Sequence, residues 1–258
     1  MPAKAVLPIN KLPHRPGLFW PTFVTAAALL ILIALGTWQV ERLQWKQGLL
    51  DRIAERVHAP PVPIELALAQ ATPSAGQVPA DVEYTHVRLK GRFRHDLERY
   101  VYATGKGDWG WDVFTPLEMY MAQPILINRG YVPQSARDPA VRKAGQPEGD
   151  VEITGLIRVT PPAKPWFIPN SEPTKLNWYW PEIVSITQSA YPDAPKRPVQ
   201  FYIDADATNL AAPPHGGTTN LNLPNRHLEY AITWFALAVT LCVIYGLFVF
   251  RRLRSGRG

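Results

Sequence analysis

Two long apolar runs dominate the pattern of hydrophobic and polar positions. Residues 18–40 and 230–250 contain no charged side chain. At about 1.5 Å of rise per residue, each run covers roughly 30 Å, the thickness of the hydrocarbon core of a bilayer. Trp20 and Trp38 bracket the first run, and Tyr230 and Trp234 open the second, as is typical of side chains at the headgroup level. The pattern predicts transmembrane helices at residues 18–40 and 227–250.

Residues 41–226 show shorter periods. Residues 41–57 continue the first helix, because Leu43, Leu50 and Ile53 recur at near-helical spacing. Beyond them, alternating apolar and polar positions separated by turn residues predict strands. The expected strands are residues 85–93, 99–104, 111–117, 124–132, 151–159 and 200–204, with short helices at 136–143 and 180–189. This predicts an α+β, mainly antiparallel domain, barrel- or sandwich-like, between the two membrane helices.

The formal net charge of +6 would suit a nucleic-acid-binding protein if the charge formed one patch. Instead, basic residues gather in the N-terminal arm, residues 1–17, and in the tail, residues 251–258. Such flanks stay in the cytoplasm, so both termini are expected there, with the central domain outside it and no nucleic-acid partner. The first run is too long for a cleaved signal peptide, and the arm lacks a Ser- and Arg-rich transit sequence. We therefore expect a bacterial cell inner membrane and a periplasmic domain.

Patterns that indicate catalysis are missing from the sequence. There is no Gly-x-Ser-x-Gly, His-Glu-x-x-His, phosphate-binding glycine loop or dinucleotide fingerprint. Residues 105–110 are glycine-rich but lie between two expected strands, which predicts a hairpin loop. The only cysteine, Cys242, lies in the second apolar run, so no disulfide forms within the chain. These features predict that the protein is not an enzyme.

Some polar residues admit two interpretations each. His86 and His95 could approach each other from neighbouring strands, but two histidines do not make a zinc site, and surface positions are the simpler interpretation. Asp204 and Asp206 point to one face of a strand, and a solvated edge explains them more simply than acid–base catalysis.

His227 stands at the start of the second apolar run, with Tyr230 and Trp234 on roughly the same helical face. An interfacial anchor is the simpler interpretation. The alternative is an axial haem ligand, because a neutral imidazole binds iron well and an apolar groove accommodates a porphyrin. The pattern alone favours the anchor.

Three motifs in order resemble one family. Residues 36–46 (GTWQVERLQWK), 128–133 (NRGYVP) and 225–235 (NRHLEYAITWF), supported by GRF at 91–93 and GLIR at 155–158, are similar to the Surfeit locus protein 1 family. Position 131 is Tyr where many members have Trp. The resemblance spans about residues 18–252.

The resemblance implies an assembly factor for haem–copper terminal oxidases, chiefly cytochrome c oxidase, that helps haem a reach subunit I. Besides the lipid bilayer, the partners it implies are subunit I and haem a synthase. It also implies that His227 is the haem-associated residue, the only metal contact being through the haem iron. Trp38 and Gln39 should lie at a similar depth, as a wall beside the haem or as plain interface anchors, two interpretations of equal weight.

Arg129, in the central motif, could pair with a carboxylate inside the domain or with a haem propionate. The role inside the domain is favoured. Two rival functions for the whole protein remain open at this point. One is a membrane-anchored scaffold for oxidase subunits that binds no haem, and the other is a periplasmic enzyme with an unrecognised active site.

Overall fold

The computed structural model describes residues 17–70, 82–104, 108–120, 122–160, 163–193, 199–207, 212–221 and 224–255. The chain forms two compact units. The helix-pair unit comprises Met1–Leu49 and Pro224–Gly258, and the β unit comprises Leu50–Leu223. Each unit is described on its own.

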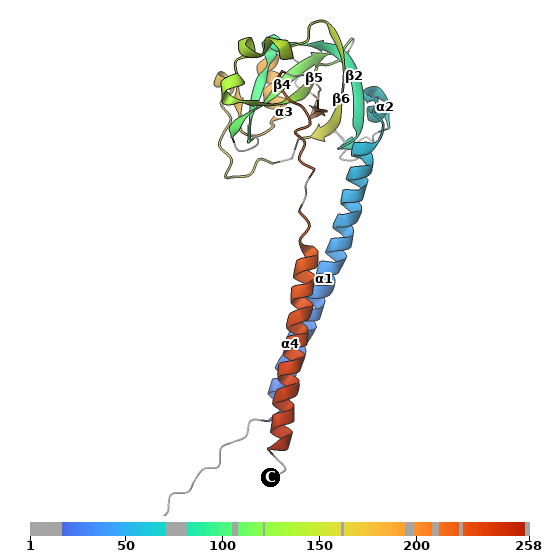
Figure 1. The fold of residues 1–258 in the computed structure, drawn as a ribbon, viewed down its shortest axis with the longest axis vertical. Coiled ribbons are helices and arrows are strands. Elements are labelled where there is room, and N and C mark those ends of the chain that lie inside the picture. The colour runs from blue at the N-terminus through green and yellow to red at the C-terminus, as the bar shows by residue number, and fades with distance from the viewer. Residues whose placement is uncertain are drawn as a thin grey trace, which may run out of the picture. The chain divides into compact units, whose positions relative to one another are not determined.

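Two antiparallel helices make up the helix-pair unit (Figure 1). They are α1 (Phe19–His58), whose last residues belong to the β unit, and α4 (His227–Arg254). The hydroxyls of Thr22 and Tyr245 are hydrogen-bonded near one end, and Gln39 contacts His227 near the other. Both helices are long and apolar enough to cross a membrane, as the two apolar runs predict. The helical continuation through residues 41–57 is also confirmed.

Small residues allow α1 and α4 to approach closely. Gly36 on α1 is buried, as are Ala231 and Ala238, two turns apart on α4. A Cβ atom on Gly36 would lie 2.7 Å from Cε1 of Phe235, so the ring occupies the space that a side chain would need. Because lipid tails are as apolar as leucine, helices in a membrane associate largely through such close packing.

The β unit is built on one sheet of eight strands within the described residues, in the order β1-β2-β6-β8-β5-β4-β3-β7. The strands are β1 (Val62–Pro63), β2 (His86–Phe93), β3 (Arg99–Thr104), β4 (Trp109–Glu118), β5 (Ile125–Pro133), β6 (Asp150–Val159), β7 (Asn177–Trp178) and β8 (Phe201–Ala205). An additional pairing of β2 with β4 closes β2, β6, β8, β5 and β4 into a ring. The sheet is therefore a small barrel.

Antiparallel pairs predominate, as predicted, but β1–β2, β3–β7 and β5–β8 are parallel. The six strands expected from the sequence are all present within one or two residues of their predicted ends. The pairing of Thr104 with Trp109 also confirms a hairpin between β3 and β4, although residues 105–107 lie outside the described residues.

Successive side chains of a strand point to opposite faces of the sheet, so the core consists of separate clusters. One cluster contains Val87, Leu89, Ile127, Ile157 and Ile203, and the ends of β2 and β4 contribute Phe93 and Leu117 to it. Side chains at intervening positions, such as Leu126 and Tyr202, join Phe114 and Trp178 in a second cluster. A third cluster gathers Tyr100, Trp111, Val113 and Val132.

Short helices complete the unit. The helix α2 (Ile64–Ala69) adds Ile64 and Ala67 to the first cluster, and α3 (Ile183–Ala190) adds Ile183 and Ile186 to the second. The 3₁₀ segments are His95–Leu97, Gln134–Ala136, Pro139–Gly145 and Pro173–Lys175.

The short helix predicted at residues 136–143 is present only in part, as a 3₁₀ helix that begins at Pro139. A separate 3₁₀ segment ends at Ala136, and Arg137 and Asp138 lie between the two. Pro139 has no N–H to continue a helix from the preceding turn. Asp138 instead starts a new segment, and its carboxylate accepts a hydrogen bond of 2.9 Å from the backbone N–H of Ala140.

Candidate functional site

His227 meets Gln39 between the two helices of the helix-pair unit. His227 is the first residue of α4, and its Nδ1 lies 2.8 Å from Oε1 of Gln39 on α1. Gln39 is one of the few buried polar residues of the described part of the chain, at 9% exposure. The sequence predicts that the two residues share a depth, and the structure brings them into direct contact.

This hydrogen bond sets the chemistry of the imidazole. The carboxamide oxygen of Gln39 can only accept, so Nδ1 must donate the proton. In a neutral ring the lone pair then belongs to Nε2. A histidine whose Nδ1–H is held by an oxygen acceptor is the usual form of a metal- or haem-ligating imidazole, because the acceptor fixes both the tautomer and the ring orientation.

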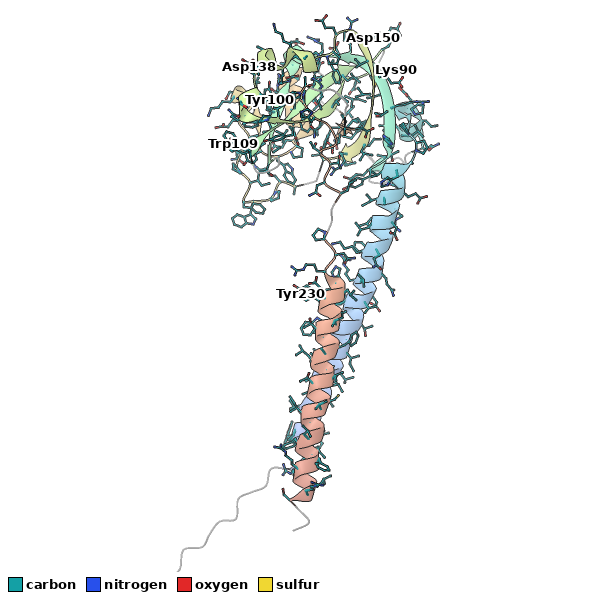
Figure 2. The ribbon with its side chains drawn as sticks, in the orientation of Figure 1. Lys90, Tyr100, Trp109, Asp138, Asp150 and Tyr230 are labelled. Carbon is teal, nitrogen blue, oxygen red and sulfur yellow. The ribbon has the colours of Figure 1, made fainter. Side chains whose placement is uncertain are left out.

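The other residues predicted around His227 divide between two faces. Trp234 is only partly exposed and lies on the face of α4 that also carries the buried Ala231 and Ala238. Tyr230, in the first turn of α4 (Figure 2), is 52% exposed, and Trp38 on α1 is 53% exposed. Gln39 and Trp234 therefore accompany His227 between the helices, whereas Trp38 and Tyr230 project outward at the same level.

Two further residues of this site were not predicted as site residues. Lys46 on α1 donates to the carbonyl oxygen of Pro224, just before α4 begins. Oδ1 of Asn225 is buried and has no hydrogen-bond partner among the residues that the structure describes. Both lie in the sequence motifs at 36–46 and 225–235, so the motifs signalled them without indicating a contact.

Arg129 lies in the β unit, and its donors are already engaged there. Its guanidinium donates to the carbonyl oxygen of Gly145, lies 3.5 Å from Glu98 and sits over the ring of Phe93. The side chain is 7% exposed. Burial lowers the pKa of Arg129 to about 10, against the opposing effect of the Glu98 charge. These contacts give Arg129 the role inside the domain that the sequence favours.

Asn128 and Gly130, its neighbours in the central motif, hold the end of β5. Asn128 accepts a hydrogen bond of 3.0 Å from the N–H of Gly130 and donates one of 2.9 Å to Asp204. Gly130 has a φ of +110°, and a Cβ there would lie 1.9 Å from the carbonyl oxygen of His215. Only glycine fits this position.

The solvated edge expected for Asp204 is wrong. Asp204 is 4% exposed, because β8 lies between β5 and β6 and the carboxylate receives hydrogen bonds from three residues. Asp206, just beyond β8, accepts hydrogen bonds from His86 and Thr154. His86 and His95 are also less exposed than surface positions would be, at 17% and 18%, and each is bound to other partners. They do not form a pair.

Comparison with known proteins shows the family of the chain. A model of the SURF1 family matches residues 26–239, from the first apolar helix into the second. The chain belongs to the SURF1 family. Surfeit locus protein 1 of Rattus norvegicus is 32% identical over 241 residues, covering 86% of this chain and 72% of that protein. The Mus musculus protein is 32% identical over 228 residues, covering 82% and 70%, and the Takifugu rubripes protein is 30% identical over 221 residues, covering 79% and 86%.

The SURF1 family assignment confirms the resemblance carried by the three motifs. The matched residues, 26–239, include both Gln39 and His227 as well as the β unit between them. Both residues of the contact between the helices therefore lie within the matched region.

Proposed function

We propose that this SURF1-family protein assists the assembly of cytochrome c oxidase by holding haem a transiently where Gln39 meets His227. Family membership supports a role in oxidase assembly and, by the same token, favours an assembly factor over an enzyme. The haem step is our own inference. Its proposed recipient is oxidase subunit I, with haem a synthase as the donor-side partner.

The observation that carries the proposal is the hydrogen bond of 2.8 Å between His227 Nδ1 and Gln39 Oε1. It leaves Nε2 as the ring nitrogen able to bind iron, so His227 would be the axial ligand and Gln39 a positioning residue. Haem supplies an iron with an axial site for such a nitrogen. Trp234 and the apolar surface of α4 suit the faces of a porphyrin, and Oδ1 of Asn225 is an acceptor nearby in the sequence that no described residue uses.

The same helices support a placement in the membrane. Because α1 and α4 are antiparallel, the ends at Phe19 and Arg254 lie together, and the basic tail follows α4. We propose that this end faces the cytoplasm of a bacterial cell and that the β unit is periplasmic, because the basic flanks of membrane helices stay on the cytoplasmic side.

The decisive experiment is the visible spectrum of full-length protein purified from cells that make haem a. We expect haem a with the wild type and loss of most of it with His227→Ala. Gln39→Leu should retain less haem than the wild type, because the imidazole loses its fixed tautomer, and second-sphere changes typically weaken metal binding about 10–100-fold.

His58→Ala is the matched control, because it removes a histidine from α1 that is exposed and whose Nδ1 is hydrogen-bonded to the carbonyl oxygen of Ala54. This variant should carry as much haem as the wild type. Equal haem in the wild type and in His227→Ala would overturn the assignment.

A further inference from the structure

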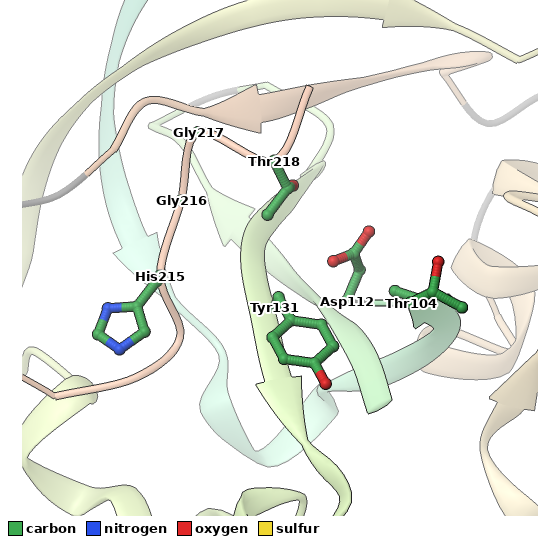
Figure 3. A pocket seen from close by; sticks show the side chains of 8 residues that line it. Thr104, Asp112, Tyr131, His215, Gly216, Gly217 and Thr218 are labelled. Atoms are coloured by element: carbon green, nitrogen blue, oxygen red, sulfur yellow. The ribbon is translucent and has the colours of Figure 1, made fainter. Parts of the chain in front are cut away.

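The β unit contains a pocket of about 740 Å³ that shares no residue with the helix pair. The end of β3, Asp112 of β4, Tyr131 of β5 and residues 215–218 line it (Figure 3). The volume falls within the range of small-molecule sites.

The wall formed by residues 215–218 is held firmly. His215 and Tyr131 exchange two backbone hydrogen bonds of 3.2 and 3.3 Å, and the N–H of Gly217 donates to Ala205 over 2.8 Å. Gly216 lies so close to Asp206 that a Cβ would be 2.1 Å from its carbonyl oxygen. This wall of the pocket is thus preformed, which reduces the entropy lost when a ligand binds.

Two carboxylates near this wall differ in the hydrogen bonds that they accept. Asp204 receives hydrogen bonds from Asn128 at 2.9 Å, Arg158 at 3.1 Å and Thr219 at 2.7 Å. Asp112 lines the pocket, and its Oδ1 is buried with no hydrogen-bond partner among the described residues. Charge compensation is therefore complete at Asp204 and incomplete at Asp112.

The surroundings of Asp112 oppose its negative charge. Burial and the charge of Asp204 raise its pKa to about 7, and a hydrogen bond from Asn128 only partly offsets them. Among the described residues, Tyr131 and Tyr202 also interact with it, while Arg158 is bound to Asp204 and His215 projects to the other side of Tyr131 (Figure 3). A half-buried carboxylate of this kind, with one oxygen that no described residue hydrogen-bonds, gains from any positive charge brought to it.

We propose that this pocket binds a small organic cation, with a primary ammonium or amidinium group at Asp112 and its body against the ring of Tyr131. The hydroxyls of Thr104 and Thr218 line the same space, and no Lys or Arg does so among the described residues. The described residues also contain no group of three or more His, Cys, Asp or Glu side chains that could hold a metal ion. An organic cation satisfies the charge and can also stack on an aromatic ring.

The test measures binding of benzylamine and of benzyl alcohol, its neutral counterpart, to the full-length protein in lipid nanodiscs by ligand-observed NMR. At pH 8 we expect benzylamine to bind at least about tenfold more tightly, the usual gain of a charge-assisted hydrogen bond. Asp112→Asn should remove this preference. Asp150→Asn, which removes an exposed carboxylate of β6 outside the pocket, should leave it unchanged.

A second arm uses only the wild type. Benzylamine stays protonated from pH 5.5 to 8, whereas Asp112 loses its proton within that range, so the preference for benzylamine should grow with pH. The proposal is overturned if the two probes bind equally at pH 8, if Asp112→Asn keeps the preference, or if Asp150→Asn loses it as well. None of these outcomes bears on haem binding by the helix pair.

Discussion

Glu98 is the most enclosed acidic residue described in the β unit, and its partners explain how a charge is tolerated there. It is 3% exposed and is bound by Arg142, which is 2% exposed, through a hydrogen bond of 3.2 Å and a second, shorter one. Arg129 lies 3.5 Å away and His95 3.6 Å away. Burial raises the pKa of Glu98, but the nearby His95, the hydrogen bonds from Arg142 and the two arginine charges outweigh it, so the pKa is lowered overall.

Arg142→Met should therefore be severely destabilising. The substitution removes the main partner of Glu98 and leaves a buried carboxylate with too little compensation, at a cost of about 3–5 kcal/mol in the free energy of unfolding. Urea titration of the full-length protein in detergent, followed by tryptophan fluorescence, measures the difference. Arg92→Met is the control, because Arg92 is 65% exposed and its pair with Asp150 spans 3.7 Å. Its effect should stay within about 1 kcal/mol.

The pH dependence of the free energy of unfolding tests the same prediction in a second way. Because the folded pKa of Glu98 lies below its ordinary value of 4.5, the unfolded chain binds more protons in this range. The stability that Glu98 contributes is present above pH 4.5 and is lost as the pH falls through the folded pKa. The difference between wild type and Arg142→Met should therefore be larger at pH 7 than at pH 3. A pH-independent difference would contradict the role given to this charge.

Among the secondary-structure elements, the rotation of α1 against α4 decides which side chains meet. Gly36 lies one turn before Gln39, and the Phe235 ring fills the space where a Gly36 side chain would be. We predict that Gly36→Ile forces the helices apart, breaks the contact of Gln39 with His227 and lowers the haem a content of the purified protein at least several-fold.

Rescue distinguishes this explanation from general misfolding. The double variant Gly36→Ile, Phe235→Ala restores the space and should recover much of the haem that the single variant loses. Phe235→Ala alone should have the smaller effect. Failure of the double variant to recover any haem, with the protein still folded and inserted, would contradict the packing argument.

The same elements show how far the sequence predicts the fold. Strand β2 is predictable because Val87 and Leu89 face the core while Arg88 and Lys90 are exposed, so its period of two is visible. Strands β1 and β7 have two residues each within the described chain, too few to show any period. The sequence predicts that Asp204 is exposed, because its three hydrogen-bond partners come from distant positions that no local pattern reveals.

The candidate site is predictable only in part, for a similar reason. Hydropathy and the motifs place Trp38, Gln39 and His227 at one depth. Which of the adjacent residues Trp38 and Gln39 faces His227 depends on the rotation of α1, which the contact of Gly36 with Phe235 helps to set. That contact joins residues 199 positions apart in the chain, and no local pattern records it.

At the scale of the whole molecule, chemistry is distributed over two units. The helix pair carries the contact of His227 with Gln39, and the β unit carries the Asp112 pocket and the buried charges around Glu98. The β unit occupies most of the chain, Leu50–Leu223, although the proposed haem site needs none of its residues. The β2–β4 pairing closes the barrel, and a barrel can carry a surface that recognises a partner. The haem site and any such surface lie in different units and can be tested separately.

Deleting the gene in the native cell distinguishes haem delivery from scaffolding. If the protein delivers haem a, we expect oxidase subunit I to remain in the membrane with oxidase activity and haem a absorbance largely lost. A scaffold that binds no haem would instead leave little subunit I, because unassembled subunits are degraded. Complementation extends the test: His58→Ala should restore activity fully, whereas His227→Ala should restore subunit I but little activity. If His227→Ala restores activity as well as the wild type does, the helix pair acts as an anchor and the haem role falls, while membership of the family stands.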